Sequence, residues 1–126
     1  MSMDRAVDVL IVDDSSVARS IIERALSLGR LHVSNVYQAS NGKEGLEVLR
    51  AKKVDLVITD VNMPVMTGLQ MVEAMSSSPA LRNMPIIIVS SNPSGEMPRS
   101  ARVRALCKPF TPETLVRLVK EVIETA

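Results

Sequence analysis

Residues 9–14 read Val-Leu-Ile-Val-Asp-Asp, an apolar run that ends abruptly in two carboxylates. Three of its four apolar residues are β-branched, a composition typical of a strand that is buried on both faces. Strands of this kind belong to parallel sheets that are covered by helices on both sides. The run therefore predicts an α/β fold in which Asp13 and Asp14 lie at the carboxyl end of a buried strand.

Similar apolar runs recur along the 126-residue chain, and helical patterns separate them. We expect further strands at 33–39, 54–59, 85–89 and 105–107. Strands that alternate with helices run parallel and are joined by right-handed crossovers. The sequence thus predicts a doubly wound sheet of five parallel strands with helices on both faces.

The predicted helices have recognisable start signals and apolar faces. The first is capped by Ser15 or Ser16 and ends near Gly29. Its apolar residues recur at helical spacing, and we expect the following to face the core: Val17, Ile21, Ala25 and Leu28. The last helix begins with Thr111 as its cap and Pro112 at the first helical position.

The composition is that of an ordinary globular domain, with 46% hydrophobic and 23% charged residues. One Tyr, one Phe, no Trp and a net charge of +1 argue against a nucleic-acid contact. Cys107 is the only cysteine, which excludes a disulfide within the chain, and we expect it to pack as a buried thiol. No apolar run is long enough to span a bilayer, and no signal-peptide pattern is present. We therefore expect one cytoplasmic domain over residues 1–126 that makes no membrane contact.

Chemically useful residues follow four of the predicted strands. Asp13 and Asp14 follow the first, Asp60 the third, Ser90 the fourth and Lys108 the fifth. In an open α/β sheet, ligands bind in the crevice outside the carboxyl ends of the strands. Each aspartate taken alone is more simply explained as the cap of the helix that follows it.

Together, the three carboxylates need another explanation. Carboxylates about 5 Å apart repel by roughly 3 kcal/mol per pair at an effective dielectric constant of 20. Lys108 supplies one compensating charge, and Mg²⁺, which binds carboxylate, water and phosphate oxygens, would supply two more. The pattern favours a site that handles phosphoryl groups, with Asp60 as the nucleophile because it stands alone at a strand end. Ser90 is then the hydrogen-bond donor, and Asp13 and Asp14 are the metal ligands.

The same residues resemble the motifs of a known family. They are Asp13-Asp14, then Asp60 with Asn62-Met63-Pro64 and Gly68 behind it, then Ser90, and finally Lys108-Pro109-Phe110. This set, which covers essentially the whole chain, is similar to the receiver domain of two-component response regulators, in particular to single-domain chemotaxis-type regulators. The resemblance implies a flavodoxin-like sheet of strand order 2-1-3-4-5. It also implies a signalling phosphoacceptor, not an enzyme, that receives its phosphoryl group from a histidine kinase or a phosphotransfer protein.

The resemblance also implies a role for each site residue. Asp60 would become the phosphoaspartate. Asp14 and Asp60 would bind Mg²⁺ through their side chains, Asn62 through its backbone carbonyl and Asp13 through a water molecule. Ser90 and Lys108 would hold the phosphoryl oxygens and, by moving toward them, would pull the ends of the fourth and fifth strands into the active conformation.

Two features depart from the family pattern. Ala105 occupies the position, three residues before the lysine of the fifth strand, where the family has an aromatic residue that swings inward on phosphorylation. The segment that joins the last two strands is also short, and Pro93 and Pro98 disfavour a helix within it. We expect an irregular fourth crossover, with at most a short helix at 99–103, and an atypical signalling output to a protein partner.

Two other functions stay open. A phosphatase with an aspartyl nucleophile also combines Asp, Ser, Lys and a metal on a doubly wound sheet. It needs an acid two residues after the nucleophile, where this chain has Asn62. A receiver-like interaction module that works without phosphorylation is the second alternative. Ala105 and the short crossover favour that module, whereas the complete set of site residues argues against it.

Overall fold

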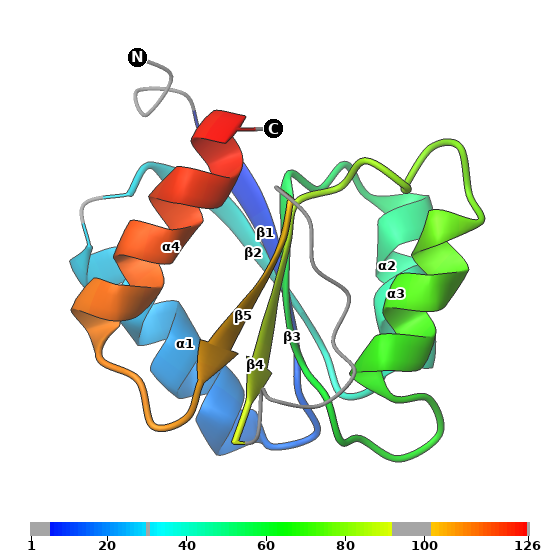
Figure 1. Ribbon diagram of the computed structural model, residues 1–126, viewed down its shortest axis with the longest axis horizontal. Helices are drawn as coiled ribbons and strands as arrows, with labels where there is room; N and C mark the ends of the chain where they lie inside the picture. Colours follow the sequence, from blue (N-terminus) through cyan, green and yellow to red (C-terminus); the bar gives the residue numbers. More distant parts are fainter. Residues whose placement is uncertain (1–5, 30, 92–101, 126) are drawn as a thin grey trace.

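The computed structural model describes residues 6–29, 31–91 and 102–125, the side chain of residue 125 excepted. Five parallel strands form one sheet in the order β2-β1-β3-β4-β5, which confirms the predicted doubly wound fold (Figure 1). The strands are β1 (Val7–Val12), β2 (Val33–Ala39), β3 (Leu56–Asp60), β4 (Ile86–Ser90) and β5 (Val103–Cys107). The helices are α1 (Ser16–Leu28), α2 (Gly42–Ala51), α3 (Gly68–Ser76) and α4 (Pro112–Thr125).

The residues of β1 alternate between two hydrophobic cores. Val9 and Ile11 belong to the core that includes side chains of α1 and α4. Leu10 and Val12 belong to the core that includes side chains of α2 and α3. All four are at most 1% exposed. Because successive side chains of a strand point to opposite faces, a strand covered by helices on both faces has to be apolar throughout.

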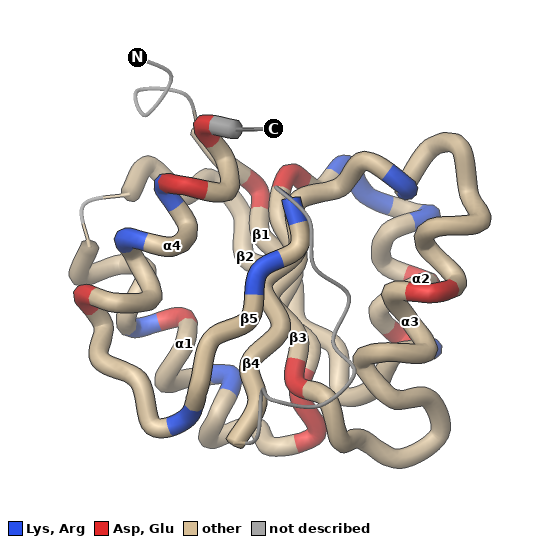
Figure 2. The backbone as a smooth tube through the Cα atoms, in the orientation of Figure 1, with Lys and Arg blue, Asp and Glu red and all other residues tan. Residues whose placement is uncertain are grey.

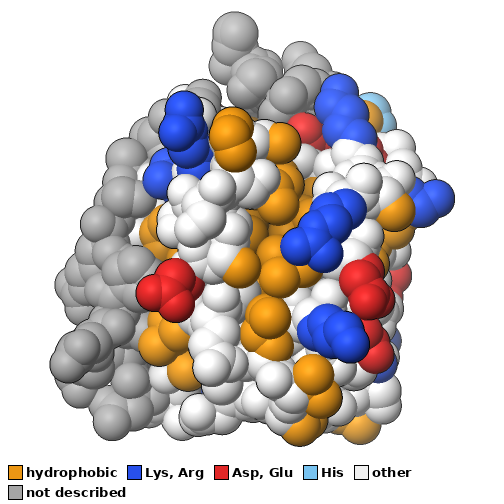
Figure 3. Space-filling view, turned by 90° about the vertical axis from the view of Figure 1, so that its right-hand side faces the viewer, with side chains coloured by type: hydrophobic (Ala, Val, Ile, Leu, Met, Phe, Trp, Pro, Cys, Tyr) orange, Lys and Arg blue, Asp and Glu red, His pale blue; other side chains and the backbone are white. Residues whose placement is uncertain are grey.

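In the described part of the chain, two helices cover each face of the sheet. α1 packs beside α4 on one face, and α2 packs beside α3 on the other (Figure 1). On the α2 and α3 side, hydrophobic side chains form a band down the middle of the described surface, with Lys and Arg beside it (Figure 3). None of the helices in the described ranges is both long enough and apolar enough to span a membrane.

Helix α1 forms where the sequence predicts it but buries a different face. Its buried residues are Ile22, Ala25 and Leu26, whereas Val17, Ile21 and Leu28 are 67%, 56% and 65% exposed. The predicted inward face was therefore wrong except at Ala25. Both sets of residues have helical spacing, and neighbouring positions lie only about 100° apart around a helix. Periodicity identifies an apolar stripe, but it does not tell which stripe faces the sheet.

Strand β5 begins at Val103, earlier than the predicted start at Ala105. Val103 is buried and pairs with Ile86, so it belongs to the sheet and not to the short helix expected at 99–103. Residues 99–101 of that expected helix lie outside the described residues, as does most of the fourth crossover. Cys107, at the end of β5, is exposed, so the prediction of a buried thiol was wrong.

The two isoleucines at positions 21 and 22 provide a direct test of the orientation of α1. Ile22→Ala should lower the free energy of unfolding by about 2–4 kcal/mol, because it opens a cavity in the core. Ile21→Ala is the matched control and should cost less than about 1 kcal/mol, because its side chain is mostly in solvent. Urea unfolding followed by circular dichroism measures both values, and equal losses would contradict this orientation.

Candidate functional site

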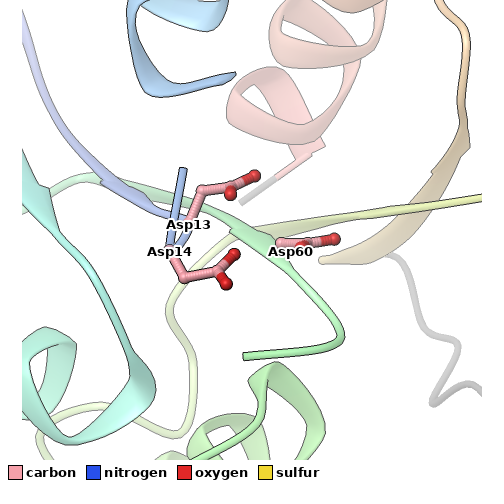
Figure 4. A group of neighbouring side chains, drawn as sticks. All are labelled: Asp13, Asp14 and Asp60. Atoms are coloured by element: carbon pink, nitrogen blue, oxygen red, sulfur yellow. The ribbon is translucent and has the colours of Figure 1, made fainter. Parts of the chain in front are cut away.

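Three carboxylates meet at the carboxyl ends of two adjacent strands. Asp13 and Asp14 directly follow β1, and Asp60 is the last residue of β3, which pairs with β1. One oxygen of each carboxylate lies within 4.8 Å of the others, and the three side chains point to the same side (Figure 4). Acidic positions gather at this lower end of the sheet in Figure 2. The structure thus brings together the three aspartates that the sequence singles out.

The three carboxylates differ in their exposure to solvent. Asp13 is 3% exposed, and the side chain of Asp60 is 14% exposed. Asp14 is exposed. The cluster is therefore mostly buried at Asp13 and exposed to solvent at Asp14, where a small ion or a phosphate ester can enter.

Lys108 supplies positive charge to the cluster. Its Nζ donates a hydrogen bond to Asp60 Oδ1 at 3.2 Å, and the lysine side chain is 37% exposed. Lys108 follows β5, and β4 lies between β5 and β3, so the lysine reaches across the end of β4. Its backbone N–H donates to the carbonyl oxygen of Ser90 at 2.8 Å, which ties the loop after β5 to the end of β4.

Ser90 and Asn62, the other two expected site residues, lie at the same edge of the sheet. Ser90 ends β4, the strand between those of Asp60 and Lys108, and it is 7% exposed. Asn62 is exposed in the loop after β3, two residues beyond Asp60. The whole set of expected residues thus surrounds one end of β3 and β4.

Asp13 is held in an environment that disfavours its charge. Burial raises the pKa of the Asp13 carboxyl above its usual value, and the negative charges of Asp60 and Asp14 act in the same direction. The Ser15 N–H, which donates to Asp13 Oδ1 at 2.9 Å, and the positive charge of Lys108 oppose the shift. The net direction is upward because burial, the largest cause, and the two neighbouring carboxylates together outweigh the Ser15 N–H and Lys108.

Gly68 allows the loop after β3 to pack against the main chain of Asp60. Its N–H donates to the carbonyl oxygen of Val61 at 2.9 Å. A Cβ atom at this position would lie only 2.0 Å from the carbonyl oxygen of Asp60, a distance that no side chain tolerates. The glycine of the sequence motif is therefore explained by close approach, and the approach brings the first residue of α3 against the end of β3.

Arg19 touches the main chain of the cluster, although no sequence motif points to it. Its Nη1 donates a hydrogen bond to the carbonyl oxygen of Asp13. The only sequence signal is the presence of a basic residue close to the N-terminus of α1, where the helix dipole disfavours positive charge. That signal is weak by itself, so the contact could be found only in the structure.

A largely apolar groove of about 570 Å³ opens beside the cluster, between α1 and the loop that leads from β5 to α4. Its lining residues are Asp13, Ala18, Ile21, Ile22, Ser91, Lys108, Pro109 and Phe110. Ile21, one of the exposed apolar residues of α1, is therefore also part of the groove beside the carboxylates.

A family profile, known sequences and solved structures all relate this chain to the same kind of protein. A family profile described as the response regulator receiver domain matches residues 9–120. The chain is 35% identical to a chemotaxis protein CheY homolog of Campylobacter jejuni (strain 81-176), over 93% of this chain and 92% of that protein. It is 36% identical to chemotaxis protein CheY1 of Helicobacter pylori (strain 26695), over 93% and 97% of the two chains. The solved structure of the chemotaxis response regulator CheY4 of Vibrio cholerae is similar with a TM-score of 0.81 and 32% identity, covering 93% and 98%.

Removing the buried charge at position 13 should stabilise the metal-free protein. Asp13→Asn should raise the free energy of unfolding at pH 7 by about 1–3 kcal/mol, because it removes the cost of burying a charged carboxylate and the repulsion from Asp60 and Asp14, while an oxygen still accepts from Ser15 N–H. The pKa of Asp13 is higher in the folded protein than in the unfolded chain, so the folded protein binds more protons at this group. The free energy of unfolding therefore falls as the pH rises through this range. The difference between variant and wild type should therefore shrink as the pH falls toward 3.8, the unperturbed value.

Urea unfolding in EDTA at several pH values measures this difference. Asp55→Asn is the matched control, because Asp55 lies just before β3 at the opposite end of that strand and its Oδ2 accepts from Asp8 N at 2.9 Å. The control should not reproduce the pH-dependent gain. An Asp13→Asn variant less stable than wild type at pH 7 would contradict the electrostatic account of the cluster.

Proposed function

The chain belongs to the family of response regulator receiver domains, and from this premise we propose that it is a phosphoacceptor in a two-component phosphorelay. In this proposal, residues 1–126 act as a single receiver domain that takes a phosphoryl group onto Asp60. The donor is a phosphohistidine of a histidine kinase or a phosphotransfer protein. The observation that carries the proposal is the contact between Lys108 Nζ and Asp60 Oδ1, at 3.2 Å, inside a cluster of three carboxylates.

The donor set of the cluster fits Mg²⁺. Three carboxylates against one lysine leave a net negative charge, and Asp13 is buried with a raised pKa. Hard oxygen ligands at an edge open to solvent are what Mg²⁺ binds, together with water and phosphate oxygens. We assign Asp14 and Asp60 to it through their side chains, Asn62 through its backbone carbonyl and Asp13 through water. When bound, the ion would neutralise charge on the oxygens of the phosphoryl group that is transferred.

The residues of the chain have separate tasks in the transfer. An oxygen of the Asp60 carboxylate attacks the phosphorus in line; the new O–P bond forms while the N–P bond of the phosphohistidine breaks. The imidazole leaves with the electron pair of that bond. Lys108, which contacts Asp60 Oδ1, would contact a phosphoryl oxygen, and the Ser90 hydroxyl would donate a hydrogen bond to another. The domain thereby assists only its own phosphorylation and dephosphorylation and is a signalling module, not an enzyme.

The groove beside the cluster gives the donor protein a place to dock. Ile21 and Phe110 line it, and Asp13 and Lys108 connect it to the carboxylates. The exposed apolar residues of α1 extend this surface away from the site. The prediction that the domain is cytoplasmic stays part of the same proposal.

The output of the domain is proposed to be atypical. Ala105 lies half-buried in β5 and pairs with Ile88 of β4. An alanine side chain has no rotamers, so position 105 cannot switch by a change of side-chain torsion. A protein partner would therefore read the state of Asp60 through other parts of the domain.

Phosphorylation of Asp60 can be tested with a small phosphodonor. Incubation with Mg²⁺ and acetyl phosphate should give a single phosphoryl adduct by intact mass, and Asp60→Asn should abolish it, because the amide is not a nucleophile of this kind. The matched control Asp55→Asn changes an aspartate near the other end of the same strand and should be phosphorylated like wild type.

The outcomes separate the three candidate functions. An adduct that persists in Asp60→Asn would overturn the assignment of Asp60. A folded wild type that forms no adduct would favour a phosphorylation-independent interaction module. Multiple turnover of unrelated phosphate esters would favour an aspartyl-nucleophile phosphatase, although Asn62 stands where such an enzyme needs an acid.

Metal binding can be tested without phosphorylation. Mg²⁺ at about ten times its dissociation constant should stabilise the folded wild type by on the order of 1 kcal/mol, because it binds the folded state only. Asp14→Asn should lose this stabilisation and remain folded, since Asp14 is exposed. Thermal unfolding with and without Mg²⁺ measures the effect. Equal stabilisation of Asp14→Asn and wild type would exclude Asp14 as a ligand.

A further inference from the structure

Arg19 connects three elements at the site. Its Nη1 donates to the carbonyl oxygen of Asp13, just beyond β1. Its Nε donates to Oε1 of Gln38 at 2.8 Å, and Gln38 lies in β2, the strand beside β1. One guanidinium therefore joins α1, the end of β1 and the end of β2.

The partner of Arg19 is itself held in place. The Gln38 Nε2 donates to Glu23 Oε1 at 2.9 Å, and Glu23 lies one helical turn beyond Arg19 on α1. The hydrogen bonds thus run from Asp13 through Arg19 and Gln38 and return to the helix at Glu23. The Arg19 guanidinium is therefore oriented by two acceptors, the Asp13 carbonyl oxygen and the Gln38 side chain, and Gln38 is in turn oriented by Glu23.

The Arg19 contact completes the fixation of Asp13. The N–H of Asp13 donates to the carbonyl oxygen of Ala39 at 3.0 Å, and its Oδ1 accepts from Ser15 N at 2.9 Å. Arg19 holds the remaining main-chain group, the carbonyl oxygen. That carbonyl and the N–H of Asp14 belong to one planar peptide unit, so fixing the carbonyl also fixes the direction in which the chain enters Asp14.

The position of Arg19 is unfavourable for the helix alone. A cation near a helix N-terminus interacts unfavourably with the helix dipole, and the first turn of α1 contains no acidic residue to offset it. A hydrogen bond from a charged donor to a carbonyl is stronger than one between neutral groups. The presence of an arginine at this position is therefore explained by its hydrogen bond to Asp13 and not by any stabilisation of α1.

We infer that Arg19 is a positioning residue for the carboxylate cluster: through the Asp13 carbonyl it sets the direction of the Asp14 carboxylate toward Asp60. In this inference it acts through the main chain of Asp13 and binds neither the metal ion nor the phosphoryl group itself. The inference rests on the proposed function in one respect, because its readout is the affinity of the cluster for Mg²⁺. Groups that orient metal ligands typically change metal affinity by about tenfold or more when removed.

The sign of the effect separates positioning from simple electrostatics. If Arg19 acted only as a nearby positive charge, its removal would strengthen Mg²⁺ binding, because like charges repel. If it positions the ligands, its removal weakens binding despite the loss of that repulsion. The two accounts therefore predict changes of opposite direction.

The experiment is isothermal titration of metal-free protein with MgCl₂. Arg19→Met should weaken Mg²⁺ binding about tenfold, and Arg19→Lys, which keeps the charge but not the fork, should give an intermediate value. Gln38→Leu leaves the arginine in place and removes its support, so it should weaken binding, but by less than removal of Arg19 itself. Arg24→Met is the matched control, an exposed arginine on the same helix, and should bind like wild type.

Each result bears on the inference. Binding by Arg19→Met that is equal to or tighter than that of wild type would overturn it and leave the proposed function intact. Absence of Mg²⁺ binding in wild type would overturn both the inference and the magnesium assignment. Urea unfolding in EDTA shows whether each variant is folded at the titration temperature; if Arg19→Met is not, Arg19→Lys and Gln38→Leu decide the question by the same criterion of weakened binding.

Discussion

Repulsion among three carboxylates at one edge of the sheet is the constraint on which the site depends. Parallel strands that pair side by side end at the same edge, so the pairing of β1 with β3 forces Asp13 and Asp14 toward Asp60. At about 5 Å each pair costs roughly 3 kcal/mol at an effective dielectric constant of 20. The buried residues on both faces of the sheet oppose this cost, and Lys108 and the Ser15 N–H offset part of it locally. The fold therefore stabilises a local charge arrangement that its own side chains only partly neutralise.

The sequence predicts most strongly those features that depend on a short segment. It also predicts those that follow from the carboxyl ends of parallel strands lying at the same edge of the sheet. The apolar run of β1 and its carboxylates predict a buried strand with a site at its end, and both are present. Lys108 was expected at the same edge because it follows another strand, and it contacts Asp60. The strand order came from resemblance to a family, since alternation of strands and helices alone does not specify which strands are neighbours.

Features that depend on contacts between distant segments escaped prediction. The inward face of α1 is selected by the sheet and by α4, so the stripe with Ile21 and the stripe with Ile22 could not be distinguished from helical spacing alone. Arg19 binds a main-chain oxygen, and main-chain acceptors leave no trace in the identity of the residue that carries them. The early start of β5 at Val103 follows from its pairing with Ile86. The strand propensity of the residues around Val103 gives no information about this contact, because Ile86 is distant in the sequence.

Gly68 has a mechanical consequence for any chemistry at Asp60. The carbonyl oxygen of Asp60 accepts a hydrogen bond from Thr59 Oγ1 at 2.9 Å, and the first residue of α3 lies so close that a single added carbon would collide with it. The carbonyl group of Asp60 therefore lies between a hydrogen bond from β3 and the first residue of α3. A chemical change at the Asp60 carboxylate would therefore be accommodated by movement of the side chains that face it. The backbone of β3 would keep its position.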